Sequence, residues 1–140
     1  TRGVLRSSSN GSLQNNVNVN GAGRENLLAA VSATAGLDPV SLSFGAVPSG
    51  SGQTRQKSFT LTNLSSTARS YSLTITGQPA NSVAYSVNPS SVSLAADAAV
   101  TVTVTMTASQ GASIGGKQAI LEVGSTEGNI AHAALFTLIK

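Results

Sequence analysis

Few side chains in this 140-residue sequence could carry out nucleophilic or acid–base chemistry. It contains a single histidine, His132, and no cysteine. A hydrolytic triad needs a nucleophile, a base and an orienting carboxylate held together, and zinc sites take three or four His, Cys or carboxylate ligands. Neither set is recognisable, because Asp38 and Asp97 both fall in turn contexts. We therefore expect no catalytic residue, no metal ligand and no cofactor, and we interpret His132 as structural or exposed.

Three other patterns could serve binding. The stretch GASIGG (111–116) lacks the Gly-Lys-Ser/Thr ending of a phosphate-binding loop and runs into a predicted strand, which favours a hairpin loop. Tyr71 and Tyr85 could form an exposed ligand platform, but both alternate in phase with apolar neighbours, which predicts partial burial. Sequons begin at Asn10 and Asn63 and would matter in a eukaryotic secreted protein. In a chain of bacterial style we interpret them as coincidental.

Composition excludes several classes of function. The net charge is +3 and only 9% of residues are charged. The eight basic residues are scattered and there are only five aromatic residues, so the stacking platform of a single-strand nucleic-acid binder is not expected. No apolar run reaches the ~18 residues of a membrane span, and no signal peptide is visible. The chain begins with Thr1 rather than Met, which fits a fragment or a processed product.

The elements that would position these side chains have the period of β-strands. After residue 39, apolar residues alternate with Ser and Thr, most clearly in VTVTVTM at 100–106. In the first such stretch, Val40, Leu42 and Phe44 are expected to point inward. The predicted strands lie within 40–44, 57–63, 71–75, 83–87, 91–94, 100–106, 117–123 and 133–139. Seven or eight strands without an intervening helix predict an all-β fold, an antiparallel sandwich over 37–140. A closed barrel is the alternative.

The segment before the strands has a different period. The stretch GAGRENLLAAV (21–31) predicts a glycine turn followed by a short helix, and Gly36 is placed to end it. The apolar stripe of this helix comprises Leu27, Leu28 and Val31. A helix this short is marginal alone in water. Residues 1–36 are therefore interpreted as a separate N-terminal segment that needs a partner surface.

Two stretches within the predicted sandwich resemble known β modules. The stretch 42–63, LSFGAVPSGSGQTRQKSFTLTN, resembles the L-x-F-G-x-V-x-x-G … L-x-N pattern of bacterial immunoglobulin-like and ASH-like sandwiches. The matching positions are Leu42, Phe44, Gly45, Val47, Gly50, Leu61 and Asn63. The stretch 87–108 resembles the later strands of fibronectin-III-like domains in secreted subtilisin-like peptidases. The resemblance implies an immunoglobulin/fibronectin-III-like sandwich of seven to eight strands.

The stretch 20–33, NGAGRENLLAAVSA, resembles the end of a subtilisin-like catalytic domain. In that family a Gly-Ala-Gly-Arg turn precedes a last helix, which packs on the catalytic domain before the chain enters a C-terminal sandwich. Residues 1–36 would then be the remnant of an upstream catalytic domain. The nucleophile motif of the family, Gly-Thr-Ser-Met-Ala, is absent, as are its Asp and His motifs, so no catalytic role is carried over.

The resemblance implies a non-catalytic accessory module of a secreted subtilisin-like serine peptidase. Such a module would stabilise or position the catalytic domain, or contact a substrate or surface, outside the cell or at its surface. Its expected partner is the upstream peptidase domain of the same polypeptide, with a protein or polysaccharide surface as a further possibility. The alternative is an adhesion or carbohydrate-binding module. An exposed aromatic face would favour that alternative, and the scarcity of aromatic residues argues against it.

Overall fold

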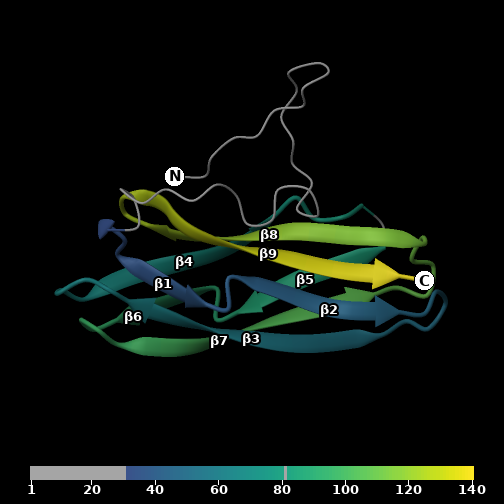
Figure 1. Cartoon of the computed structure of the whole chain (residues 1–140), viewed down its shortest axis with the longest axis horizontal. Helices are drawn as coiled ribbons and strands as arrows, with labels where there is room; N and C mark the ends of the chain where they lie inside the picture. Colours follow the sequence, from purple (N-terminus) through teal and green to yellow (C-terminus); the bar gives the residue numbers. More distant parts are fainter. Residues whose placement is uncertain (1–30, 81) are drawn as a thin grey trace, which may run out of the picture.

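The computed structural model describes residues 31–80 and 82–140, which form two facing sheets (Figure 1). The four-stranded sheet has the order β1 (Ala35–Asp38), β3 (Thr54–Asn63), β7 (Ala99–Ala108) and β5 (Val83–Asn88). The five-stranded sheet has the order β2 (Ser41–Val47), β9 (Gly128–Ile139), β8 (Gly115–Ser125), β4 (Arg69–Thr76) and β6 (Ser91–Leu94). The elements formed by the described residues are all strands, as the sequence predicts.

The alternating sequence of β7 explains its central position. Successive side chains of a strand point to opposite faces, and here the valines and the methionine point into the sandwich while the threonines point out. Val102 and Val104 are fully buried, and β7 pairs with β3 on one side and with β5 on the other. Phe59 of β3 lies directly opposite Val102 in the register.

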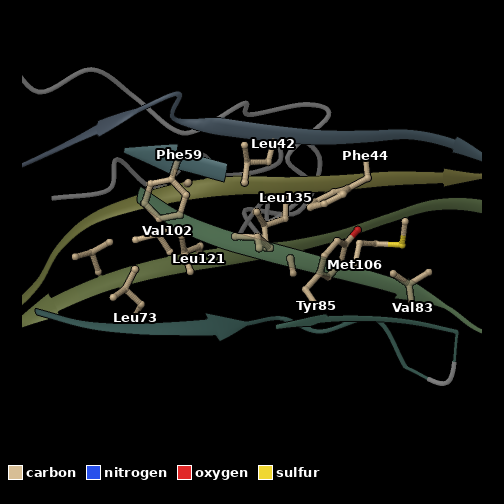
Figure 2. Close-up of a cluster of buried hydrophobic side chains, with 14 of the residues drawn as sticks. Leu42, Phe44, Phe59, Leu73, Val83, Tyr85, Val102, Met106, Leu121 and Leu135 are labelled. Carbon is tan, nitrogen blue, oxygen red and sulfur yellow. The ribbon is translucent and has the colours of Figure 1, made fainter. Parts of the chain in front are cut away.

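The core fills the space between the two sheets (Figure 2). Both sheets contribute to it, with Phe59, Val102 and Met106 from one and Leu121 and Leu135 from the other. Each of these side chains is at most 2% exposed. The apolar alternation of the sequence therefore produces one continuous core over the described strands.

The number and direction of the strands differ from the prediction. Residues 31–80 and 82–140 form nine strands rather than seven or eight. The additional strand is β1, in which the alternation of Ala35 and Leu37 with Gly36 and Asp38 is too short to reveal a strand. The sandwich is also not wholly antiparallel, because β2 pairs in parallel with β9. This happens because the chain leaves β1 in one sheet and enters β2 in the other without reversing direction.

This crossing also corrects the facing of Val40. Val40 was expected to point inward, yet it is 52% exposed, since Pro39 and Val40 connect the two sheets and the strand proper begins at Ser41. Gly36 lies within β1, opposite Thr62 of β3, and does not end a helix. Apart from Val31, the glycine turn and the short helix predicted for 21–31 lie outside the described residues.

The glycine of the F-G pair in β2 has a specific conformational role. The register between β2 and β9 shifts between Ser43 and Ala46, and Gly45 within this bulge has a φ of +74°. A side chain is strained in that backbone region. The bulge allows both Phe44 and Val47 to point into the core although they are three positions apart.

Candidate functional site

The structure places His132 on an outer face rather than in a catalytic arrangement. It lies on β9, opposite Glu122 of β8, and is half-buried. The two carboxylate oxygens of Glu122 accept hydrogen bonds from the Thr76 hydroxyl (3.3 Å) and the Asn129 amide (2.8 Å). Within residues 31–80 and 82–140 no group of three or more His, Cys, Asp or Glu side chains could hold a metal ion.

The two aspartates lie on other elements. Asp38 ends β1 in the four-stranded sheet, and Asp97 lies in the turn between β6 and β7, where its φ of +57° is a left-handed turn conformation. His132 belongs to the five-stranded sheet. The fold thus places the three groups on three separate elements, and the absence of catalytic residues remains a prediction.

The glycine-rich stretch 111–116 is not a hairpin loop, which corrects the expectation. It connects β7 in one sheet to β8 in the other, and Gly115 already pairs with Ile139 of β9. Ala112 is buried at the edge of the core, and the Lys117 ammonium donates to the Ser113 hydroxyl at 2.8 Å. The stretch therefore crosses between the sheets and closes one end of the core.

No aromatic platform is exposed. All five aromatic residues of the sequence lie in the described part; Phe44, Phe59, Tyr71 and Tyr85 are at most 3% exposed, and Phe136 is half-buried. Burial raises the pKa of both tyrosines. The positive charge of Arg69 partly offsets this rise in the pKa of Tyr71, and the hydrogen bond with Thr137 partly offsets it in the pKa of Tyr85. The rings of Tyr71 and Tyr85 belong to the core. Their predicted partial burial is confirmed, and the observed burial is more complete than predicted.

The most densely bonded polar group of the described fold is the amide of Asn63. Its nitrogen donates to three backbone carbonyl oxygens, those of Thr67 (2.8 Å), Leu94 (3.2 Å) and Ala95 (2.9 Å). Because the nitrogen carries two hydrogens, at least one is shared. One side chain at the end of β3 thereby fixes both the β3–β4 turn and the end of β6.

The oxygen of the same amide is equally occupied. It accepts from the Ser65 backbone N–H (3.0 Å) and from the hydroxyls of Ser65 (2.7 Å) and Tyr71 (2.8 Å). The Tyr71 hydroxyl also lies 2.8 Å from the Thr34 carbonyl oxygen, and its single hydrogen can serve only one acceptor at a time. We call Asn63, Ser65 and Tyr71 the Asn63 cluster.

The Asn63 cluster is structural in geometry. Asn63 is fully buried, so the sequon that it begins is inaccessible to glycosylation in the folded protein. The L-x-N pattern identified the position from the sequence. It could not reveal the three carbonyl partners, because two of them lie more than thirty positions away in the chain.

Two side chains occupy backbone groups at the sandwich edges. The Gln78 amide donates to the Tyr85 carbonyl (2.6 Å) and accepts from the Tyr85 N–H (2.9 Å), on the edge strand β5. Arg55 of β3 donates to the Phe44 carbonyl oxygen of the edge strand β2 (2.7 Å) and is itself held by Gln53. Such contacts use up groups that another strand could pair with.

Comparison with known proteins identifies the fold and no family. No protein-family description and no curated protein matches the sequence. Among solved structures, the ASH/PapD-like domain 7 of human CEP192 matches 77% of this chain and 86% of its own length, with a TM-score of 0.59 and 16% identity. The class 5 fimbriae chaperone CfaA matches 76% of this chain and 56% of its own, with a TM-score of 0.53 and 12% identity.

A third structure belongs to a peptidase. The secreted serine protease VesC from Vibrio cholerae matches 89% of this chain with a TM-score of 0.57 and 16% identity, but only 26% of its own length is covered. These likenesses establish an immunoglobulin-like sandwich fold. In the described part of the chain, no helix has the length and hydrophobicity to span a membrane.

Proposed function

We propose that this chain is the non-catalytic accessory sandwich of a secreted serine peptidase, following its catalytic domain in the same polypeptide. The likeness to VesC supports this proposal most directly. It extends over nearly all of this chain but only about a quarter of the protease, as expected if a module of this kind is appended to a larger secreted enzyme. In such a protein the sandwich stabilises or orients the catalytic domain outside the cell.

The subtilisin-like family is the proposed parent. The stretch 20–33 has the Gly-Ala-Gly-Arg turn and the following apolar stripe that resemble the last helix of that catalytic domain. It directly precedes the sandwich, whose first strand begins at Ala35. Helix followed by sandwich is the order in the family.

Burial of the aromatic residues argues against the alternative of a carbohydrate-binding module. Sugar-binding faces rely on exposed rings, and four of the five rings here are inside the core. The outer face of the four-stranded sheet instead carries paired hydroxyls, such as Ser58 with Thr103 at 3.2 Å. The fifth ring, Phe136, is half-buried.

Two measurements test the proposal. The coding sequence upstream of Thr1 should contain the Gly-Thr-Ser-Met-Ala motif; its absence would refute the subtilisin-like parent. The 140-residue chain should not hydrolyse casein or peptide esters, and His132→Ala should match it in every assay. Hydrolysis that a serine-directed inhibitor blocks, and that His132→Ala abolishes, would show that the chain is itself an enzyme.

A further inference from the structure

The outer faces of the two sheets differ in polarity. On the four-stranded sheet the outward side chains form hydroxyl and amide pairs, such as Gln56 with Thr105 at 3.2 Å and Thr54 with Thr107 at 3.4 Å. The part of the five-stranded sheet formed by β4 and β6 is polar as well. Across β8 and β9 the outward positions are mixed: Glu122 lies opposite His132, and Gln118 lies opposite Phe136. The apolar outward side chains of these two strands form what we call the outer strip, which comprises Ile120, Ala134, Phe136 and Leu138.

The outer strip is continuous across the strands. Ile120 of β8 lies opposite Ala134 of β9, and Ser41 of β2 lies on the other side of Ala134. Phe136 and Leu138 follow along β9 on the same face, because their neighbours Leu135 and Ile139 point into the core.

No member of the outer strip belongs to the contiguous core cluster between the sheets. Ala134 is buried, at 8% exposed, but packs outside the contiguous core cluster, and the other three are half-buried and lie outside that cluster as well. Large apolar side chains that cluster on an outward sheet face mark an interaction surface. An accessory sandwich with two solvated faces would carry Ser and Thr there, as the opposite sheet does.

The size of the outer strip indicates what covers it. A stable interface between separate proteins buries about 800 Å² on each partner, which four side chains cannot supply. A segment of the same chain needs less area, because tethering removes most of the translational and rotational cost of association. The thirty residues that precede the described part enter the sandwich at β1, and β1 contacts β9.

The helix predicted before that entry point is comparable in length to the outer strip. From Ala134 to Leu138 the strip extends about 13 Å along β9 at 3.3 Å per residue. The helix of two to three turns predicted after the glycine turn would be about 11–16 Å long at 5.4 Å per turn, and Leu27 and Leu28 belong to its predicted apolar stripe. Val31 is 87% exposed and therefore lies outside the contact.

We propose that the outer strip is the docking surface for the chain's own N-terminal segment, which it binds through Leu27 and Leu28. This inference concerns the 140 residues by themselves; in the proposed parent, where the same apolar stripe would pack on the catalytic domain, Leu27 and Leu28 would contact one surface or the other. The docked segment extends the module beyond its two sheets and covers the apolar part of β8 and β9.

Paramagnetic relaxation tests the position of the segment. The chain has no cysteine, so Asn26→Cys gives a single site for a nitroxide spin label. We expect broadened amide signals at 118–122 and 134–138, and unaffected signals at 101–105 on the opposite sheet. Absence of broadening in the first two ranges would overturn the proposal. A mixture of labelled chain with unlabelled, isotope-enriched chain distinguishes contacts between copies, and broadening seen equally in that mixture would also overturn it.

A double-mutant cycle tests the energetic link in the full chain. Phe136→Ala should lower the urea midpoint, and the shift should shrink by about half or more when Leu27 and Leu28 are both alanine, because the partners no longer meet. Val31→Ala is the matched control and should leave the effect of Phe136→Ala unchanged. Additive effects of Phe136→Ala and the two leucine substitutions would show that the segment does not dock on the outer strip.

Discussion

Replacing the Asn63 amide by an isosteric apolar group should be among the most damaging single changes in the sandwich. In Asn63→Leu, three backbone carbonyls lose a donor and the Ser65 N–H loses its acceptor, whereas the Tyr71 hydroxyl keeps the Thr34 carbonyl as a partner. The Leu94 carbonyl bond is the fully buried one. A buried group without a partner costs about 1–3 kcal/mol and a partly solvated one less. Because the Ala95 carbonyl keeps the Ala98 N–H as a partner, the sum is about 2–4 kcal/mol.

The free energy of unfolding should be measured by urea denaturation, followed by circular dichroism and by tyrosine fluorescence, since the chain has no tryptophan. The denaturant slope should not change, because the same surface is exposed on unfolding. Ser65→Ala is the matched control: it removes two hydroxyl contacts of the same cluster and should cost about 1 kcal/mol or less.

A loss of less than about 1 kcal/mol in the free energy of unfolding of Asn63→Leu would contradict this prediction. The three carbonyls would then be reached by water, and the amide would not connect the β3–β4 turn to the end of β6. Asn63→Asp distinguishes the contribution of the amide nitrogen from that of the amide oxygen, because the carboxylate keeps the acceptor oxygen and loses the N–H donors. It should be at least as destabilised at neutral pH, where a buried carboxylate would face three carbonyl oxygens.

Three further outcomes are expected. Val102→Ala should lower the free energy of unfolding by about 1–3 kcal/mol through lost burial and a cavity, whereas Thr103→Ala on the outer face should change it by under about 0.5 kcal/mol; equal effects would mean that the facing of β7 is wrong. Because burial raises the pKa of Tyr71 and Tyr85, the native state favours the protonated phenol, so stability is full below the ordinary tyrosine pKa of about 10 and falls as pH rises through the folded values. Phenolate absorbance should thus appear together with unfolding, and titration of both rings in a folded protein would contradict it. Gln78→Leu frees the Tyr85 backbone and should increase self-association in sedimentation velocity; a strictly monomeric variant would show that this contact does not protect the edge.

The strands were predictable where the apolar period was strong, and the connections were not. The valines of β7 and the Phe59 and Leu61 pair of β3 fix their own facing, because burial of one face leaves no other register. β1 was missed since the alternation in AGLD is too short, and the parallel β2–β9 pair depends on a change of sheet that no local pattern encodes. Val40 was assigned the wrong facing for the same reason.

The polar contacts were less predictable than the strands. The sequence pattern marked Asn63, but its partners come from the far ends of other elements and are brought together only by the fold. The two tyrosines were correctly expected among apolar side chains. The Thr34 carbonyl near Tyr71 lies before β1, and the Thr137 hydroxyl near Tyr85 lies on a strand distant in sequence, so neither acceptor could be inferred.

The central position of β7 has a consequence for how the chain avoids aggregation. Its ten residues are uncharged and free of proline, which is the composition of segments that stack into amyloid-like zippers. In the folded protein both of its edges are occupied, by β3 and β5. The risk of such stacking therefore exists only during folding, before β7 has paired with β3 and β5. Arg55 and Lys57 of β3, which lie opposite Met106 and Val104, place positive charge beside that segment as it pairs. With so few charges elsewhere, the chain depends on rapid and correct strand pairing, more than on electrostatic repulsion, to remain in solution.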